Sequence, residues 1–314
     1  MASVTLPSRP GSASDGRGGP PGDGGCAPLL ATLRPGDTVS GVYACTRKDR
    51  LITRAGLPYL ALDLRDRSAT LTGRCFRDAD LLGSTFERGD LVQVQGRAQR
   101  FRDQLQLELT HIAPAPEEER DPSRFLPVAY RDLDELEGFL EHLAREVAEP
   151  GLRALLDALL GDAHLRREWR RAPCSRAGHH AYLGGLLEHT VAVATLALEV
   201  SQQHPRLDSD LLLSAALVHD LGKTREYTYG AEVGLTDEGR LLGHIELGLR
   251  VLDENAPAQL GSHQRLALWH CVLCHHGPEP APGRRYGSVE ALALHRLNAL
   301  DAGVKGALER GLHP

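Results

Sequence analysis

Histidine and aspartate recur in the C-terminal half of the chain, at or near the ends of apolar stretches with helical patterning. In chain order these residues are His189, His219, Asp220, His244, His275, His276 and Asp301. Imidazole and carboxylate are the usual ligands of divalent transition metals. A bundle of helices that points these side chains inward would hold one metal ion or two, and two ions a few ångströms apart suit displacement at phosphorus.

Residues 132–314 show the pattern of helices that could bring these side chains together. Apolar residues recur at spacings of three and four, and glycine or proline stands at the breaks. His219 and Asp220 follow the apolar run LLLSAALV and precede Leu221-Gly222, which indicates a helix end. An ionised aspartate at the buried end of such a helix needs a cation or hydrogen-bond donors. We therefore predict an all-α domain with a shared metal site.

Residues 28–113 alternate apolar and polar side chains over five short stretches, from TVSGVYACT to QLQLELTHI, with Gly- and Asp-bearing turns between them. Five strands with period-two patterning favour a small closed barrel. Among such barrels, the OB-fold binds oligonucleotides on one face. The predicted fold class is therefore multi-domain, with a small all-β OB-fold barrel followed by an all-α helical bundle.

Two further segments flank these domains. Residues 1–27 are rich in Gly, Pro, Ser and Asp and are predicted to be a disordered tail. Residues 114–131 hold four prolines and an acidic run, which is typical of a linker. No stretch approaches the roughly 20 apolar residues of a membrane span, and the six cysteines show no framework spacing. We expect reduced thiols, a cytoplasmic location and no membrane contact.

The predicted barrel also carries the residues that could contact a nucleic acid. The net charge of the chain is −6, but residues 28–113 hold 13 arginines and lysines against 10 carboxylates. The local sign of the charge matters more to an anionic partner than the sum does. Candidate stacking residues are Tyr43, Tyr59, Phe76 and Phe101. Candidate phosphate contacts are Arg47, Lys48, Arg50, Arg97, Arg100 and Arg102.

Longer strings around the histidines carry a family resemblance. The order H…HD…D is similar to that of the HD-domain superfamily of metal-dependent phosphohydrolases. The strings HHAYLGGLLEHT, AALVHDLGK, GHIELGLRVL, CHHG and VEALALHRLNALDA resemble the YhaM-type 3′→5′ exoribonucleases, which join an N-terminal OB domain to an HD domain. The resemblance covers roughly residues 30–305 and has the same domain order.

The resemblance implies a set of metal ligands and a reaction. A first ion would be held by His189, His219, Asp220 and Asp301. A second would be held by His244, His275 and His276, with Asp220 bridging the two. Family behaviour points to Mn²⁺, and the mixed nitrogen and oxygen ligands also suit Fe²⁺ or Co²⁺, with Mg²⁺ a further alternative. Single-stranded RNA would be cut from its 3′ end to nucleoside 5′-monophosphates.

Three further residues would act beside Asp220 in catalysis. The resemblance makes Lys223 a phosphate contact next to the metals, and His179 and His180 contacts of the scissile phosphate or the leaving group. Lys223 also has a simpler interpretation, as a lysine that complements a helix dipole, and the two histidines could serve the structure alone.

The chain departs from the family at two motifs. The last family motif usually reads DNLDA, whereas this chain has NALDA, with Asn298 and Ala299 in place of an Asp and an Asn. Asp301 is kept, so we expect weaker support around it and not the loss of a ligand. The family segment PAAK reads PCSR here, which places Cys174 and Ser175 where the family has alanines.

Several alternatives stay open on the sequence. One is an HD phosphohydrolase of nucleotides or of short or cyclic oligonucleotides, against which the strand-binding barrel argues. Another is a nucleic-acid-binding protein with a silent HD domain, against which the complete ligand set argues. Cys271 and Cys274 form a CxxC without a second copy, and we expect packing thiols there. The choice between RNA and DNA and the oligomeric state, a homo-oligomer included, stay open.

Overall fold

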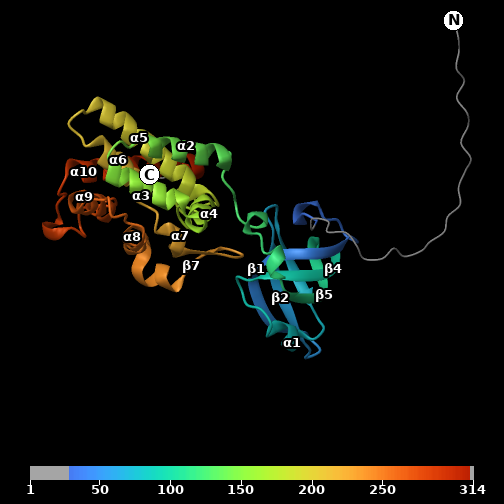
Figure 1. The fold of residues 1–314 in the computed structure, drawn as a ribbon. Coiled ribbons are helices and arrows are strands. Elements are labelled where there is room, and N and C mark those ends of the chain that lie inside the picture. The colour runs from blue at the N-terminus through green and yellow to red at the C-terminus, as the bar shows by residue number, and fades with distance from the viewer. Residues whose placement is uncertain (1–27, 312–314) are drawn as a thin grey trace, which may run out of the picture.

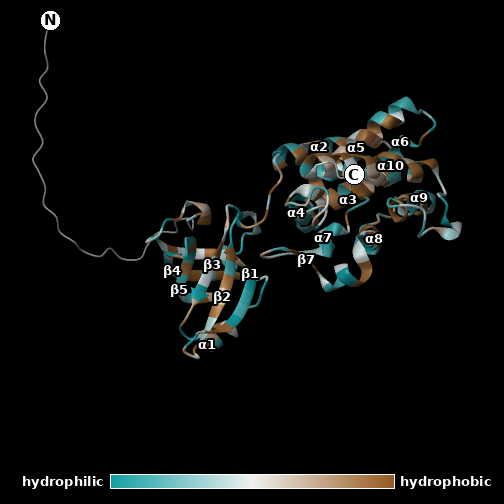
Figure 2. Cartoon of the chain, turned by 180° about the vertical axis from the view of Figure 1, so that it is seen from behind, coloured by the Kyte–Doolittle hydropathy of each residue, from teal (hydrophilic) through white to brown (hydrophobic). Residues whose placement is uncertain are grey.

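The computed structural model describes residues 28–311 and places them in a β-barrel and a helical bundle (Figure 1). The tail predicted over residues 1–27 lies outside the described residues. Apolar residues line the strands of the barrel and the helices at the centre of the bundle (Figure 2). Among the described residues, no helix is long and apolar enough to cross a membrane.

The barrel consists of five strands and confirms the predicted OB-fold class. They are β1 (Thr38–Ile52), β2 (Pro58–Arg65), β3 (Thr70–Cys75), β4 (Leu91–Phe101) and β5 (Gln104–Pro114). The sheet closes in the order β1-β2-β3-β5-β4, with β3 and β5 parallel and the other pairs antiparallel. Strand β1 pairs with β4 through its first half and with β2 through its second half. A register shift between Cys45 and Arg47 lies in the second half, and such a bulge increases the local bend of a strand.

Alternate side chains of the strands fill the barrel. Leu62 and Leu64 of β2, Val92 and Val94 of β4 and Leu107 of β5 are fully buried, because inward positions recur with period two along a strand. A short 3₁₀ turn, η1 (Leu30–Thr32), and a one-turn helix, α1 (Ala79–Gly83), complete this part.

The rest of the described chain contains nine α-helices. They are α2 (Leu133–Glu146), α3 (Pro150–Gly161), α4 (Ala163–Arg171), α5 (Gly185–Gln203), α6 (Ser209–Val218), α7 (Lys223–Glu226), α8 (Asp237–Glu254), α9 (Ser262–Leu273) and α10 (Val289–Arg310). The apolar periodicity of residues 132–314 predicted helices in this part of the chain, but it did not mark α4 or α7. It also missed a two-stranded hairpin of β6 (Tyr227–Tyr229) and β7 (Val233–Leu235), because strands of three residues are too short to show alternation.

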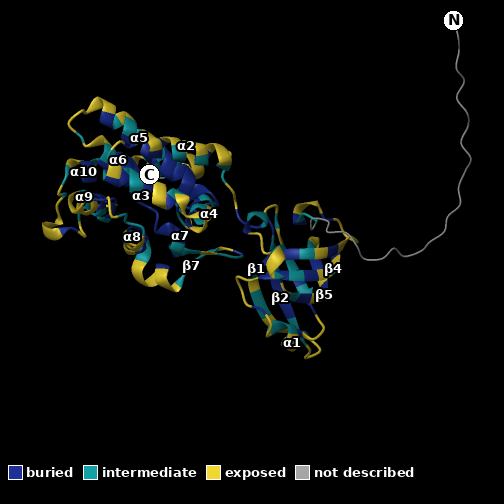
Figure 3. Cartoon of the chain, viewed as in Figure 1, coloured by how far each residue is buried: buried dark blue, intermediate teal, exposed yellow. Residues whose placement is uncertain are grey.

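Helix α6 contacts α2, α3, α5, α9 and α10, and buried residues gather inside the bundle (Figure 3). Every residue from Leu211 to Val218 is buried, which is the composition expected of a helix packed on all sides. Its first turn is capped by Asp208, whose side chain accepts a hydrogen bond from Leu211 N at 3.0 Å. The helix ends at Val218, so His219 and Asp220 emerge at its buried C-terminal end, as the sequence predicts.

The segment between barrel and bundle is short and partly structured. It contains the 3₁₀ turns η2 (Glu117–Glu119) and η3 (Pro122–Arg124). Phe125 follows them and is buried in a small apolar cluster that also contains Ala231 of the β6–β7 hairpin. The hairpin extends from the bundle towards the barrel beside this segment (Figure 1).

Candidate metal centre

Asp220 lies at the centre of the histidine cluster and is 1% exposed. Its Oδ2 atom is 3.4 Å from the Nε2 atoms of both His189 and His219. Its Oδ1 atom is 3.4 Å from Nε2 of His275 and 3.6 Å from Nε2 of His244. One carboxylate therefore faces two separate groups of imidazoles with its two oxygens, which is the geometry of a bridging ligand.

The first group consists of His189, His219 and Asp220. The Nε2 atoms of the two histidines are 3.2 Å apart. Ligand atoms held about 2.1 Å from one ion lie roughly 3–3.5 Å from each other, so these three atoms are spaced as ligands of a single ion. His219 Nδ1 donates to the Ala216 carbonyl at 2.9 Å, which fixes the tautomer that leaves Nε2 free to bind a metal.

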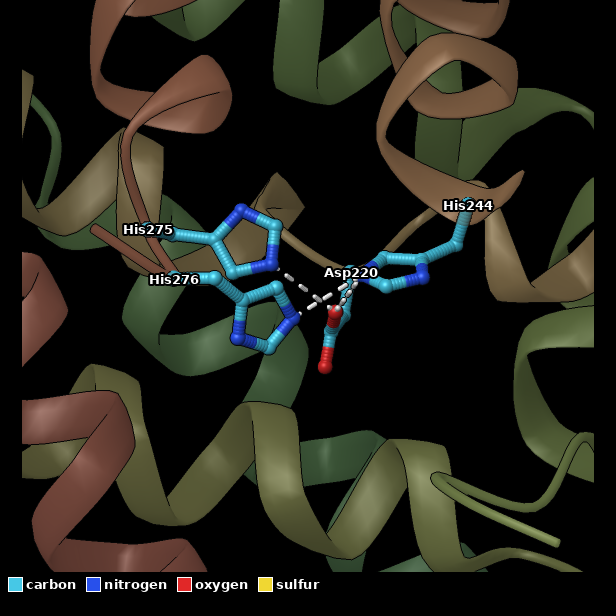
Figure 4. A group of neighbouring side chains, drawn as sticks. All are labelled: Asp220, His244, His275 and His276. Carbon is cyan, nitrogen blue, oxygen red and sulfur yellow. Dashed lines mark hydrogen bonds and ion pairs between the residues drawn. The ribbon is translucent and has the colours of Figure 1, made fainter. Parts of the chain in front are cut away.

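The second group consists of Asp220, His244, His275 and His276 (Figure 4). The Nε2 atoms of His244 and His276 are 3.0 Å apart. His275 Nδ1 donates to the Val272 carbonyl at 2.6 Å, and burial lowers the pKa of His275 to about 4, so the ring is neutral near pH 7. Neutral imidazole with a free Nε2 is the form that binds metals.

Two atoms of the second group test whether a cation fits there. Asp220 Oδ1 and His275 Nε2 are buried and have no hydrogen-bond partner among the described residues. A buried polar atom without a partner costs roughly 1–3 kcal/mol. A divalent cation between these atoms would satisfy both, so the residues present fit a metal. The described residues thus contain a His/Asp cluster that can bind divalent metal.

Asp301 approaches the cluster from α10 but lies on the outer side of His189. Its Oδ2 atom is 2.6 Å from His189 Nδ1 and 3.0 Å from His180 Nε2. Burial disfavours its charge, yet the hydrogen bonds from His180 and His189 hold the pKa of Asp301 well below its usual range. In this structure Asp301 orients His189, and its predicted role as a direct ligand stays a prediction.

His180 differs from the expectation that it contacts substrate. It is 2% exposed, and both ring nitrogens have partners within the protein, Asp301 on one side and Tyr182 Oη at 2.9 Å on the other. Tyr182 in turn donates to Glu188 at 2.8 Å, and Lys305 donates to Glu188 at 3.0 Å. The structure therefore assigns His180 to a buried chain of hydrogen bonds that supports Asp301.

Lys223 and His179 occupy the edge of the cluster. Lys223 Nζ donates to Asp220 Oδ2 at 2.6 Å and lies 3.3 Å from Cys174 Sγ. Burial alone would raise the pKa of Asp220, but the charges of Lys223 and His219 hold it well below its usual range. His179 is half-buried, with Nε2 3.5 Å from Cys174 Sγ and its ring centroid 5.3 Å from that of His189. Their predicted contacts with phosphate stay predictions.

Comparison with known proteins agrees with this division of the chain. Residues 186–303 match the HD domain, and residues 44–115 match the OB-fold nucleic acid binding domain. The 3′-5′ exoribonuclease YhaM of Bacillus licheniformis is 31% identical over 265 residues, which cover 82% of this chain and 84% of that protein. That of Bacillus subtilis is 30% identical over 259 residues, 80% of either chain.

The chain belongs to the YhaM family. The resemblance stated from the sequence is thus confirmed. Among solved structures, the HD domain of the Listeria monocytogenes phosphodiesterase PgpH is 20% identical, covers 49% of this chain and 76% of that one, and has a TM-score of 0.30. That similarity is too low to bear on function.

Glycines set the position of His244 in this YhaM-family chain. A Cβ atom at Gly222 would lie 1.9 Å from the His244 carbonyl oxygen and 2.4 Å from Gly248 N, so only glycine allows the turn after Asp220 to pack on α8. Gly243, at φ +71°, interrupts α8 just before His244. Glu226 Oε1 then lies 3.5 Å from His244 Nδ1, on the side of the ring opposite Asp220.

Asn298 lies beside the second group of ligands, and the expectation of weaker support around Asp301 stays a prediction. Its Nδ2 atom donates to the main-chain oxygen of His275 at 3.2 Å, and the side chain is 4% exposed. The residue that departs from the YhaM-family motif therefore supports the second group of ligands. Sequence reasoning also missed Glu226 and Tyr182, although a glutamate three positions after Lys223, next to the HD motif, is a signal that could have indicated Glu226.

Tyr43 corrects the expected set of nucleic-acid contacts. It is 1% exposed, lies in the barrel core, and donates its hydroxyl to the Pro28 carbonyl at 2.9 Å. A buried ring cannot stack on a base. The predicted stacking role of Tyr43 is therefore wrong for this structure.

The other three aromatic candidates of the YhaM-family barrel are accessible. Tyr59 and Phe76 stack on each other, with ring centroids 5.2 Å apart, and Phe76 is 46% exposed. Phe101 is 43% exposed, and the guanidinium carbons of Arg74 and Arg102 lie 5.1 and 5.4 Å from its ring centroid. Both sites present an aromatic surface to solvent.

Four of the six basic candidates on the barrel form ion pairs, whereas Arg97 donates to the Gly36 carbonyl at 2.9 Å and Arg102 lies near the Phe101 ring. Arg47 pairs with Asp63, Lys48 with Glu87, Arg50 with Asp80, and Arg100 with Asp103. The pairs of Arg47, Arg50 and Arg100 are exposed, and exposed ion pairs are weak, about 0–1 kcal/mol each, so a phosphate could displace their carboxylates. Their contact with nucleic acid stays a prediction.

Proposed function

We propose that this protein is a metal-dependent 3′→5′ exoribonuclease that hydrolyses single-stranded RNA to nucleoside 5′-monophosphates. The observation that carries the proposal is the carboxylate of Asp220, which faces one pair of imidazoles with Oδ2 and another group with Oδ1. Family membership supplies the direction of hydrolysis, since the relatives are named 3′-5′ exoribonucleases.

The proposed metal centre holds two divalent ions. His189, His219 and Asp220 would hold the first, and His244, His275, His276 and Asp220 the second. When bound, two such ions supply an activated water and neutralise the non-bridging phosphate oxygens. The nitrogen and oxygen donors suit Mn²⁺, Fe²⁺ or Co²⁺, and we propose Mn²⁺ as the ion used.

The surrounding residues orient these ligands and contact the substrate. Asp301 and His180 hold the His189 ring so that Nε2 points towards Asp220. Glu226 does the same for His244. Burial lowers the pKa of His179 to about 4, so near pH 7 this half-buried ring is neutral and would bind the scissile phosphate as a hydrogen-bond donor. Lys223, held at Asp220, would place its positive charge beside the same phosphate.

The barrel would hold the strand upstream of the scissile bond. Stacking of bases on exposed aromatic rings, with basic side chains along the backbone, is how barrels of this class bind single strands without sequence preference. Tyr59, Phe76 and Phe101 with Arg102 offer such a surface. We propose single-stranded RNA as the substrate, with single-stranded DNA as the comparison to be measured.

The test is hydrolysis of a 5′-labelled single-stranded RNA with Mn²⁺, beside Asp220→Ala and a matched control, Asp253→Ala, at an exposed aspartate of α8. We expect a ladder that shortens from the 3′ end in the wild type and the control, and none in Asp220→Ala or with chelator. A DNA strand of the same sequence measures the sugar preference. No shortening, with metal bound in the wild type by calorimetry, would contradict the proposal and favour a phosphohydrolase of short or cyclic oligonucleotides.

A further inference from the structure

The tip of the β6–β7 hairpin is buried against the barrel. Ala231, at the turn, is 0% exposed. It packs in an apolar cluster with residues from β1, from β4 and from the segment between barrel and bundle, namely Val42, Ala44, Leu91, Ala115 and Phe125. A hairpin that leaves the helical bundle thus ends in an apolar contact with the other half of the molecule (Figure 1).

The barrel also satisfies both main-chain polar groups of Ala231. Its N–H donates to the Gly89 carbonyl at 3.1 Å, and its carbonyl accepts a hydrogen bond from the guanidinium of Arg65. The fit is close, because a Cβ atom at neighbouring Gly230 would lie 3.0 Å from the Gly89 oxygen. Apolar burial together with paired main-chain groups defines one orientation of the tip on the barrel.

The base of the same hairpin is attached to the metal centre. Strand β6 follows α7, which begins with Lys223 bonded to Asp220 and ends with Glu226 beside His244. Strand β7 leads to Thr236, whose N–H donates to the Glu226 carbonyl at 2.9 Å and whose hydroxyl accepts from Gly239 N at the start of α8. Both strands of the hairpin are therefore fixed next to ligands.

We propose that the β6–β7 hairpin is a docking element that holds the barrel in a fixed orientation to the metal centre, and that Ala231 is its positioning residue. This inference rests on the proposed function, in which the barrel holds the strand and the bundle cuts it. A barrel tethered only by residues 115–132 would hold the strand near the centre but in many orientations. Docking keeps the path from barrel to metal constant, which raises the effective concentration of the 3′ end.

The proposal predicts a split between long and short substrates. An RNA longer than the roughly 16 nucleotides that an OB-fold covers can occupy barrel and metal centre together. A dinucleotide cannot, so its hydrolysis depends on the metal centre alone. Loss of docking should therefore affect the long strand and leave the dinucleotide unchanged.

The variant that tests docking is Ala231→Arg. It places a long, positively charged side chain in the apolar cluster around Ala231 and next to the guanidinium of Arg65. Its matched control is Glu232→Arg, the same new side chain at the exposed neighbouring position. We expect kcat/KM for the long RNA to fall at least about tenfold in Ala231→Arg, because the gain from two linked sites is of order 10²–10⁴. We expect dinucleotide hydrolysis to stay at the wild-type rate and the control to match the wild type on both substrates.

Small-angle scattering without substrate supplies a readout that does not depend on activity. We expect a larger radius of gyration for Ala231→Arg than for the wild type and Glu232→Arg, with the same thermal transition of the bundle. Unchanged scattering, or equal loss on long and short substrates, would overturn the docking role. If the wild type itself leaves RNA intact, the proposed function fails, while the scattering still decides whether the hairpin docks the barrel.

Discussion

The carboxylate of Glu226 lies 3.5 Å from Nδ1 of His244, while Nε2 of the same ring lies 3.6 Å from Asp220 Oδ1. A carboxylate behind a metal-binding imidazole fixes the ring and increases its basicity. Burial would raise the pKa of Glu226, but its contact with His244 holds the pKa below the usual value, so the group is charged near pH 7.

Glu226→Gln should therefore weaken the second metal site. We expect the affinity for Mn²⁺ at that site to fall about 10–100-fold, the usual cost of losing such a partner. Isothermal titration calorimetry of the metal-free protein measures it, with the exposed Glu232→Gln as control. Equal affinity in Glu226→Gln and the control would show that His244 needs no support from Glu226.

Gly222→Ala should disturb both the fold and the second group of ligands. Its Cβ would meet the main chain of α8 at His244 and Gly248, and main-chain atoms cannot rotate away. We expect a loss of stability of about 1–3 kcal/mol, as for other overpacked sites, and weaker metal binding.

The control is Gly138→Ala in helix α2, where nothing lies within 4 Å of the new Cβ. Its free energy of unfolding should rise by up to about 1 kcal/mol. An unchanged melting temperature in Gly222→Ala would contradict the packing described.

The metal-free protein should lose stability as the pH falls from about 6.5 towards 4. The pKa of buried His275 is lowered to about 4, so below its ordinary value of about 6.5 the unfolded chain binds a proton that the folded chain excludes. Above about pH 6.5 this histidine costs the folded protein no stability, and near pH 4 the free energy of unfolding has fallen by about 3 kcal/mol.

Both tryptophans, Trp169 and Trp269, lie in helices of the bundle, so their fluorescence follows its unfolding. In His275→Gln the free energy of unfolding should fall less steeply between about pH 6.5 and 4 than in the wild type. The same pH dependence in both proteins would show that His275 is not the cause.

Phe76→Ala should weaken the hold on single strands without changing the metal centre. Loss of one stacking ring costs about 1–3 kcal/mol of binding, so the Kd for single-stranded RNA should rise about 5–150-fold. Fluorescence anisotropy with labelled RNA and chelator measures it. Phe139→Ala, which removes a 42%-exposed phenylalanine of α2, is the control. Equal affinity in the two variants would exclude the Tyr59–Phe76 pair as a binding surface.

The sequence by itself determined the fold class, a barrel followed by a helical bundle, and the end of the helix that precedes His219 and Asp220. The alternation of apolar and polar residues over residues 38–114 predicts the strands of a barrel. The apolar run before His219 predicts a buried helix with His219 and Asp220 at its end. These are local signals, since a strand repeats every two residues and a helix every 3.6.

Only the tertiary structure decided which atoms meet. Asp301 and His189 are 112 positions apart, and no periodicity shows that the carboxylate reaches Nδ1 and not the metal side of the ring. Tyr43 lies in a stretch of β1, Val42 to Cys45, in which every residue is buried, so alternation along the strand did not show that its ring is covered. The hairpin tip at Ala231 is too short for a pattern, and its role follows from the barrel it touches. Contacts between distant segments depend on packing in three dimensions, which local periodicity does not encode.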